Sequence, residues 1–454
     1  MRRKRILIAN RGEIAVRIIR ACEESGIETV LVVSEADRDS LPARLADKVV
    51  CIGSPLPSAS YLNIPMIVAT AQATGVDAIH PGYGFLAENP ALALACENSG
   101  IIFIGPRSAT MRRIGDKLGA RELARQIGIP MNAGSAGLRG FDEVEAKVLE
   151  LGLPVIFKAS AGGGGRGMRI VRERGELKSA FDLASNEARQ AFGDGTLFVE
   201  RYIEYARHVE VQIIGDDFGR VVHLGQRDCS SQRRYQKVIE EAPPVGLSAE
   251  MSARISDAAL ALARSIHYNN AGTVEFLVDK VRDEFYFLEV NTRIQVEHPV
   301  SEEITGIDLV REQIRVAFGH PLSIEQSDVC FSGHAIECRI TAENARDNFM
   351  PTPGRITRFA VPYGSNVRVD THCYQGYVIG PYYDSLMAKV VATGDDRDTA
   401  LRNLRAALAA FEISGVSTNI PFLRFLLDQP EFIQADVHIR WVENAAARFL
   451  AATA

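Results

Sequence analysis

The feature that most constrains the fold is an alternation of polar residues between Phe285 and Pro299, where the chain reads FYFLEVNTRIQVEHP. Alternate side chains of an extended strand point to the same face. We therefore expect one strand to present a row of two carboxylates, two amides and a guanidinium. A solvated strand face is the plain alternative, but such a face would more commonly carry lysine, threonine and serine. The residues of the row are Glu289, Asn291, Arg293, Gln295 and Glu297.

A second β-rich run, residues 272–278, precedes this one, and a polar turn at 279–284 separates the two. A hairpin centred on Arg282 makes Glu275 and Glu289 cross-strand neighbours about 5 Å apart. Like charges at that distance are unfavourable unless a cation lies between them. Two carboxylates and the amide oxygen of Asn291 suit Mg²⁺, which prefers oxygen ligands and keeps sites for water and phosphate. The hairpin therefore predicts a site for a magnesium-bound nucleotide.

A glycine run is the second strong signal, within residues 157–168, FKASAGGGGRGM. Four consecutive glycines bury nothing and are costly to order, so they do not belong to a core. Strands expected at 154–158 and 168–171 argue against a flexible linker. Backbone amides of such a loop can surround an anion, and Lys158 and Arg166 add positive charge. The P-loop pattern GxxxxGK[ST] is absent, so the run predicts a different phosphate-binding loop.

Alternating strands and helices up to about residue 115 predict an α/β domain with a doubly wound parallel sheet. The first turn carries a single glycine, so a dinucleotide site is not expected. The loop at 80–89, HPGYGFLAEN, follows a strand where such sheets carry their sites, although a structural turn explains it equally well. From about residue 333 the pattern is a mixture of strands and helices. The expected strands are 5–9, 29–34, 78–80, 101–104, 335–340, 354–360 and 387–392, and the expected helices are 14–25, 398–411 and 437–449.

Composition excludes several classes of protein. The chain has 454 residues, of which 46% are hydrophobic and 24% charged, as in an ordinary enzyme of two to four domains. A net charge of −6 gives no footprint for nucleic acid. Seven cysteines without a C-x-x-C pair favour reduced thiols in the cytoplasm. No membrane span is expected, because no apolar run approaches the roughly 18 residues that one needs. No secretion signal is expected, because the apolar stretch after the basic start ends at Ala9.

Taken in order, several segments resemble the biotin carboxylases of the ATP-grasp superfamily, from about residue 4 to about residue 445. The resemblance implies an N-terminal doubly wound α/β domain (1–115), a central ATP-grasp module (116–322) with a mobile lid at about 131–203, and a C-terminal mixed α+β domain (333–442). The lid would close over bound ATP. The segments are IANRGEIA (8–15), HPGYGFL (80–86), KASAGGGGRGM (158–168), HVEVQ (208–212), QRRYQKV (232–238), NTRIQVEHP (291–299) and PYYDS (381–385).

The resemblance implies an activity. Such enzymes use ATP, two divalent ions (Mg²⁺ or Mn²⁺) and bicarbonate to carboxylate the ureido nitrogen of biotin through carboxyphosphate. Bicarbonate is a poor nucleophile until it loses its proton, so a base beside a cationic cradle is needed. Glu297 would be that base, and Arg339 would bind biotin and stabilise its enolate. The bicarbonate cradle would be Lys237, Arg293, Gln295 and Val296.

The nucleotide and metal residues are carried over in the same way. Lys117, Lys158 and the glycines Gly163, Gly164 and Gly165 would contact phosphates. Glu275 and Glu289 would bridge the metals, with Asn291 nearby. The remaining ATP-binding residues would be Glu200, Arg201, Ile203, His208 and Gln232.

Three positions depart from the family pattern. Tyr235 stands where bacterial acetyl-CoA carboxylase subunits usually have histidine, so we expect different nucleotide or phosphate contacts there. Ala161 replaces the first glycine of the commonest run. Arg201 replaces a lysine, and its contact would be through the backbone only.

Two further readings stay open at this point. One is another ATP-grasp ligase, such as a subunit that makes carbamoyl phosphate, and biotin-dependent ATP turnover would separate it from the first. The other is a nucleotide-binding regulatory subunit that has lost activity. The segments at 232–237 and 293–298 favour a biotin carboxylase, and the intact carboxylates and cations argue against the regulatory subunit.

The partners follow from what the chain lacks. It contains no Met-Lys-Met, the sequence around the biotinylated lysine of carrier domains, and no stretch for a carboxyltransferase. We expect it to act on a separate biotin carboxyl carrier protein and a separate carboxyltransferase subunit. The whole would be an acetyl-CoA or related acyl-CoA carboxylase serving fatty acid biosynthesis. The resemblance also suggests a homodimer, with no nucleic acid and no membrane.

Overall fold

The computed structural model describes residues 3–115, 117–135, 137–160 and 168–453. The predicted phosphate loop, with Gly163, Gly164 and Gly165, lies outside the described residues, as does Ala161. Lys117 begins helix α6 (Lys117–Gln126), and its predicted phosphate contact stays a prediction. The same holds for the closing of the lid over ATP.

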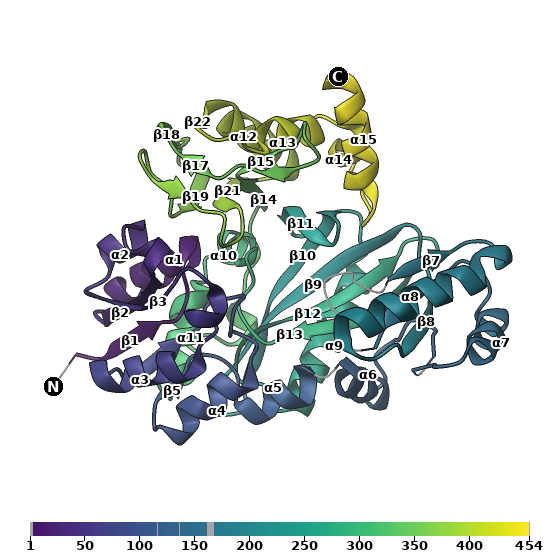
Figure 1. The fold of residues 1–454 in the computed structure, drawn as a ribbon, viewed down its shortest axis with the longest axis horizontal. Helices are drawn as coiled ribbons and strands as arrows, with labels where there is room; N and C mark the ends of the chain where they lie inside the picture. Colours follow the sequence, from purple (N-terminus) through teal and green to yellow (C-terminus); the bar gives the residue numbers. More distant parts are fainter. Residues whose placement is uncertain (1–2, 116, 136, 161–167, 454) are drawn as a thin grey trace.

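The N-terminal part is a five-stranded parallel sheet in the order β3-β2-β1-β4-β5, with helices on both faces, as predicted (Figure 1). Such an order places the first βα loop and the loop after β4 at the same edge of the sheet. Strand β3 was not predicted, because its residues are largely exposed and interrupt the apolar pattern. The strands are β1 (Arg5–Ile8), β2 (Glu28–Ser34), β3 (Lys48–Gly53), β4 (Ala78–His80) and β5 (Ile102–Phe103), and the helices are α1 (Gly12–Glu24), α2 (Leu41–Leu45), α3 (Ile64–Thr74), α4 (Pro90–Asn98) and α5 (Ser108–Gly115).

One eight-stranded antiparallel sheet runs through the centre of the molecule and into the C-terminal part, in the order β13-β12-β9-β10-β11-β14-β21-β19. The pairing of β11 with β14 joins the two parts, so residues of both can share one sheet face. Helices α9 (Ala249–Ser265), α10 (His298–Thr305) and α11 (Leu309–Ala317) pack against it. The strands are β9 (Ala206–Gly215), β10 (Val221–Arg233), β11 (Gln236–Ala242), β12 (Asn270–Asp279), β13 (Glu284–Asn291), β14 (His334–Thr341), β19 (Val367–Thr371) and β21 (Leu386–Gly394).

The predicted hairpin is formed by β12 and β13, and Glu275 does pair with Glu289. The register centred on Arg282 holds only at this end. A bulge follows Glu275, so that Phe276 pairs with Phe287, one residue off the predicted partner. An extra residue in one strand shifts every later pair in this way. The bulge could not be foreseen from the alternation alone.

The alternating row continues beyond the strand, and here the prediction is wrong. Strand β13 ends at Asn291, and residues 292–297 form bends and turns before α10 begins at His298. Arg293, Gln295 and Glu297 therefore do not share a strand face. Their side chains still lie close together. Arg293 donates to Gln295, and Gln295 and Lys237, a partner of Glu297, both contact Glu275.

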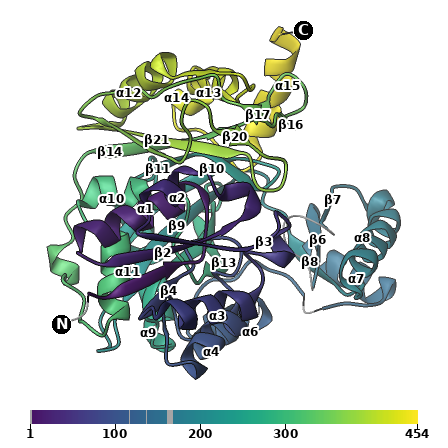
Figure 2. The ribbon, with the colours of Figure 1, turned by 60° about the vertical axis from the view of Figure 1, so that its left-hand side comes forward.

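A small separate unit projects to one side, on the right in Figure 2. It contains the three-stranded antiparallel sheet β7-β6-β8 and two helices that cover it. Its own apolar cluster includes Val155, Phe157 and Val199, all fully buried. The elements are α7 (Phe141–Leu151), β6 (Val155–Ala159), β7 (Arg169–Val171), α8 (Leu177–Phe192) and β8 (Leu197–Arg201).

The C-terminal part adds helices and short strand pairs to the far end of the large sheet. The region expected to be one strand at 354–360 is two short strands, β17 (Gly354–Arg355) and β18 (Arg358–Ala360). No helix among the described residues is long and apolar enough to cross a bilayer. The other elements are β15 (Glu343–Asn344), β16 (Met350–Pro351), β20 (Val378–Ile379), β22 (Glu412–Ser414), α12 (Arg397–Ala410), α13 (Ile420–Leu427), α14 (Pro430–Ile433) and α15 (Trp441–Thr453).

Candidate active site

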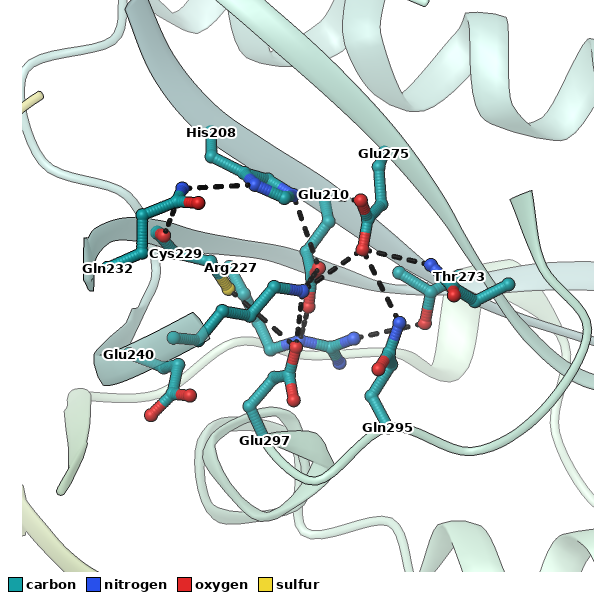
Figure 3. A network of polar contacts seen from close by, with 12 residues as sticks. His208, Glu210, Arg227, Cys229, Gln232, Glu240, Thr273, Glu275, Gln295 and Glu297 are labelled. Carbon is teal, nitrogen blue, oxygen red and sulfur yellow. Dashed lines mark hydrogen bonds and ion pairs between the residues drawn. The ribbon is translucent and has the colours of Figure 1, made fainter. Parts of the chain in front are cut away.

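A buried ammonium group lies at the centre of the site. Lys237 on β11 places its Nζ 2.6 Å from Glu210 Oε2, 3.0 Å from Glu275 Oε1 and 2.6 Å from Glu297 Oε1. Figure 3 shows the three carboxylates pointing toward one another from β9, β12 and the loop before α10. Burial lowers the pKa of Lys237, but the three carboxylates outweigh it and raise that pKa well above the ordinary value. The lysine is therefore charged at neutral pH.

Glu297, the predicted base, is fully buried and joins two predicted substrate cations. Its Oε1 accepts from Lys237, and its Oε2 accepts from Nη2 of Arg339 on β14 at 2.8 Å. Burial raises the pKa of Glu297, but Lys237, Arg339 and Arg227 lower it well below the usual range. Glu297 is therefore ionised and able to accept a proton. These residues are far apart in the sequence, so the sequence does not reveal their contact. The pairing of β11 with β14 brings Lys237 and Arg339 close enough to share Glu297.

Glu210 and Arg227, both fully buried, were not singled out by the sequence analysis. Arg227 on β10 donates from Nε to Glu210 Oε1 at 2.5 Å, and its other nitrogens reach Gln212, Thr273 and Ser301. Arg227 thus occupies one oxygen of Glu210 while Lys237 occupies the other. The available signal was the segment HVEVQ, in which Glu210 and Gln212 alternate with valines like the 289–297 row.

His208 and Glu275 lie at one side of the cluster, 3.1 Å apart between Nε2 and Oε2. Burial lowers the pKa of His208, but the carboxylate of Glu275 outweighs it and raises the pKa above the ordinary histidine value. Gln232 lies beside His208, with Nε2 at 3.4 Å from Nδ1. The structure therefore brings these three predicted residues together.

Two of the three predicted metal residues line one cavity, and the third, Glu275, is hydrogen-bonded to one of them. Glu289 and Asn291, together with Glu88, line a cavity of about 200 Å³ between β13 and helices α5 and α6. Asn291 donates from Nδ2 to Glu275 Oε1 at 2.9 Å. Two carboxylates in register and a neighbouring amide form an oxygen donor set that fits a hard divalent cation. The donor chemistry is thus consistent with the predicted metal site.

The loop at 80–89 contributes directly to the site. Its Glu88 lies 3.1 Å from Nε of Arg293 and accepts from the backbone N–H of Thr292 at 3.2 Å. Arg293 also donates to the side-chain oxygens of Gln295 and Asn291. This loop of the N-terminal part therefore orients Arg293, a predicted bicarbonate-binding residue. The sequence alone did not decide whether the loop belongs to a site or is only a structural turn.

The remaining nucleotide candidates lie around the projecting unit. Lys158 donates to Glu200 Oε2 at 2.7 Å, and Ile203 is buried beside Tyr286. The Arg201 guanidinium donates to the Tyr286 hydroxyl at 2.6 Å. Tyr235 lies half exposed in the turn between β10 and β11, and burial raises the pKa of its phenol.

The sequence matches known protein families along nearly its whole length. Three family models match consecutive parts of the chain: "Biotin carboxylase, N-terminal domain" at residues 2–111, "Carbamoyl-phosphate synthase L chain, ATP binding domain" at 116–325 and "Biotin carboxylase C-terminal domain" at 337–444. Biotin carboxylase 1 of Bacillus subtilis is 50% identical over 97% of this chain and 98% of its own length.

The chain belongs to the biotin carboxylase family. It is an ATP-dependent carboxylating ligase. A biotin carboxylase structure from Campylobacter jejuni superposes with a TM-score of 0.93 at 46% identity, covering 97% of this chain and 98% of that one. The biotin carboxylase domain dimer of Hydrogenobacter thermophilus 2-oxoglutarate carboxylase, solved with MgADP and bicarbonate, gives a TM-score of 0.92 at 46% identity over 97% of both chains.

Behind Arg339 lies a pair of acidic residues that no sequence pattern predicted. Glu240 and Glu337 are fully buried and face each other across β11 and β14. Glu240 accepts from Nε of Arg339 at 2.6 Å, whereas both oxygens of Glu337 lack a hydrogen-bond partner among the described residues. Burial raises the pKa of Glu240 to about 7 and raises the pKa of Glu337 well above the usual range. Both carboxyl groups therefore hold a proton more tightly than an ordinary glutamate does.

This predicts a pH-dependent effect of Glu337→Gln. A carboxyl whose folded pKa is raised contributes stability below its unfolded pKa, about 4.3, and loses that contribution as pH rises toward the folded value. The amide does not titrate. Glu337→Gln should therefore gain stability relative to the unchanged protein when pH rises from 5 to 8, measured by thermal unfolding.

The matched control is Glu412→Gln, an exposed carboxylate paired with Arg358. An exposed ion pair is screened by solvent and contributes little to stability, so this variant should differ little at either pH. A Glu337→Gln variant whose relative stability stays constant or falls between pH 5 and 8 would show that Glu337 is ionised when buried.

Proposed function

We propose that the chain carboxylates biotin on a separate carrier protein, using ATP and bicarbonate, as the first half-reaction of acetyl-CoA carboxylase or a related acyl-CoA carboxylase. The observation that carries the proposal is the position of Glu297 between Lys237 and Arg339. One carboxylate thus contacts both the cation proposed for bicarbonate and the cation proposed for biotin. Such a base can act where the two substrates meet.

The first step would be deprotonation of bicarbonate. Lys237, Arg293, Gln295 and the backbone of Val296 would hold the anion next to Glu297. When bicarbonate takes over hydrogen bonds from Lys237, the carboxylate loses part of the interaction that depresses its pKa. Glu297 would therefore become a stronger base as its substrate binds. The resulting dianion would attack the γ-phosphorus of ATP to give carboxyphosphate and ADP.

The second step would be transfer to biotin. Carboxyphosphate decomposes to CO₂ and phosphate, and the phosphate takes the ureido proton. Arg339 would stabilise the negative charge that develops on the ureido oxygen, while Glu240 holds its guanidinium from the other side. The nitrogen then attacks CO₂ to give carboxybiotin.

ATP would lie between the projecting unit and the central sheet. Lys117, Lys158 and residues Gly163 to Gly165 would bind its phosphates. Magnesium or manganese ions, held by Glu275, Glu289 and Asn291, would neutralise charge on the phosphates. The other proposed contacts are Glu200, Arg201, Ile203, His208 and Gln232.

We propose that the chain is divided into three domains, at 1–115, 116–322 (with a lid at about 131–203) and 333–442. The family models at 2–111, 116–325 and 337–444 support these boundaries. A separate carboxyltransferase, a homodimer and a cytoplasmic location complete the proposal. The dimer of the Hydrogenobacter domain supports the assembly.

The direct test is ATP turnover by the purified chain. ADP formation with Mg²⁺ and bicarbonate should increase when free biotin is added, and labelled carboxybiotin should appear. Bicarbonate-dependent ATP turnover that does not change when biotin is added would favour a ligase of the carbamoyl phosphate type. No turnover under any condition would favour a regulatory subunit.

The assignment of the base predicts that Glu297→Gln lowers biotin carboxylation by at least about 10²-fold, because a positioned base contributes that much. Nucleotide affinity should change little. Glu412→Gln serves as the surface control. Near-normal turnover in the Glu297 variant would remove Glu297 from the mechanism.

The metal assignment predicts that Glu275→Gln and Glu289→Gln require a much higher Mg²⁺ concentration for half-maximal ATP turnover, since each loses an anionic ligand. Asp283→Asn, in the exposed turn of the same hairpin, is the matched control. If the Mg²⁺ titration is the same in all three variants, the two carboxylates have a structural role only.

The partner assignment predicts that the purified chain carries no covalent biotin and carboxylates a biotinylated carrier faster than free biotin. A streptavidin blot of the pure protein checks the first point. A band at the mobility of the chain itself would contradict a separate carrier.

A further inference from the structure

Lys389 is a fully buried lysine outside the set of predicted site residues. It lies on β21, directly opposite Arg339 on β14 and Asp370 on β19. Its side chain leaves the large sheet on the same face as Arg339. A buried ammonium costs several kcal/mol to desolvate unless hydrogen bonds and opposite charges compensate. Its contacts therefore identify what it stabilises.

The contacts of Lys389 come from all three parts of the chain. Its Nζ donates to the backbone carbonyl of Val296 at 2.8 Å and lies 3.1 Å from Glu13 Oε1 on α1. Asp370 Oδ2 is 3.9 Å away. The N-terminal helix, the loop after β13 and the C-terminal strand thus meet at one nitrogen atom, where α1, α10 and β21 converge in Figure 1.

Lys389 keeps its charge in this position. Burial lowers its pKa, but Glu13, Glu337 and Asp370 outweigh it, so the pKa is raised above the ordinary lysine value. Glu13 is itself held by the hydroxyl of Tyr83, from the loop at 80–89. The hydrogen bond from Lys389 to Val296 is therefore charge-assisted and rigidly placed.

The carbonyl that Lys389 holds belongs to the peptide bond between Val296 and Glu297. The preceding carbonyl, of Gln295, lies 2.7 Å from Nδ1 of the buried His298. Two consecutive carbonyls of a segment that has no strand partner are thereby fixed by side chains. This compensates for the end of β13 at Asn291, after which ladder hydrogen bonds no longer hold the chain.

We propose that Lys389 is a positioning residue for bicarbonate: it fixes the Val296–Glu297 peptide and so sets the direction of both the Val296 backbone and the Glu297 carboxylate. This inference rests on the proposed function. It adds a residue that touches neither ATP nor bicarbonate yet determines how well the site is organised for the latter. Positioning errors of about 1 Å at a reacting group can cost 10²-fold in rate.

The test compares Lys389→Met with the unchanged chain. The methionine keeps most of the volume and loses the charge and the hydrogen bond. We expect KM for bicarbonate in ATP turnover to rise about 10-fold or more, as for loss of a charge-assisted hydrogen bond, while KM for ATP changes less than about twofold. Hydrogen exchange should accelerate at residues 293–299 and stay unchanged at 206–215.

Lys48→Met, at an exposed position on β3, is the matched control and should alter neither quantity. If Lys389→Met does not fold, Glu13→Gln decides with the same two measurements, because it removes one anchor of the ammonium and preserves the shape. It should shift both in the same direction by a smaller amount, about 3-fold in KM for bicarbonate.

Parallel changes in both KM values, or unchanged bicarbonate KM with unchanged exchange at 293–299, would overturn the inference. Failure of the proposed function looks different. In that case the unchanged chain would show no bicarbonate-dependent ATP turnover, while exchange at 293–299 would still report whether Lys389 holds the segment.

Discussion

The rest of the site depends on the contacts of the Lys237 ammonium group with three buried carboxylates. Glu210, Glu275 and Glu297 converge on it within 3.0 Å, and all three are buried. Three carboxylates so close would repel one another strongly in a low-dielectric interior, so all three could not be ionised there together without the lysine. Burying charges is favourable only when pairing and hydrogen bonds are nearly complete. The surrounding residues supply the remaining partners of these charges.

The continuous central sheet makes the pairing possible. Each carboxylate comes from a different segment, and the bridge from β11 to β14 brings Arg339 to the opposite oxygen of Glu297. Arg227 donates to the other oxygen of Glu210, and Glu240 accepts a hydrogen bond from Arg339. A bicarbonate anion entering this balanced cluster would compete with Glu297 for Lys237. We infer that binding and activation of the substrate are coupled through this competition.

Part of this arrangement could be predicted from the sequence. The alternating row and the hairpin placed Glu275 opposite Glu289 correctly, because cross-strand pairing depends on a local turn and a period of two. The bulge after Glu275 and the end of β13 at Asn291 were not foreseen, because both depend on what packs against the strand. The row predicted residues that do lie close together, but the prediction of one continuous strand was wrong.

Other contacts lay beyond local pattern altogether. Glu88 and Arg293 are separated by 205 positions, and the loop at 80–89 gave no local sign that it reaches the site. Glu240, Glu337 and Lys389 look like ordinary strand residues, since a charged residue on an alternating strand usually faces water. Only the three-dimensional sheet shows that these side chains face a buried interface with α10. Family resemblance predicted the residues that are proposed to bind substrates, but not the buried residues that contact them.

A crystal structure with MgADP and bicarbonate tests the central claim most directly. The account predicts that bicarbonate lies within hydrogen-bond distance of both Lys237 and Glu297, and that the direct contact between their side chains, 2.6 Å here, lengthens. Bicarbonate bound away from Lys237, with that contact intact, would contradict the account.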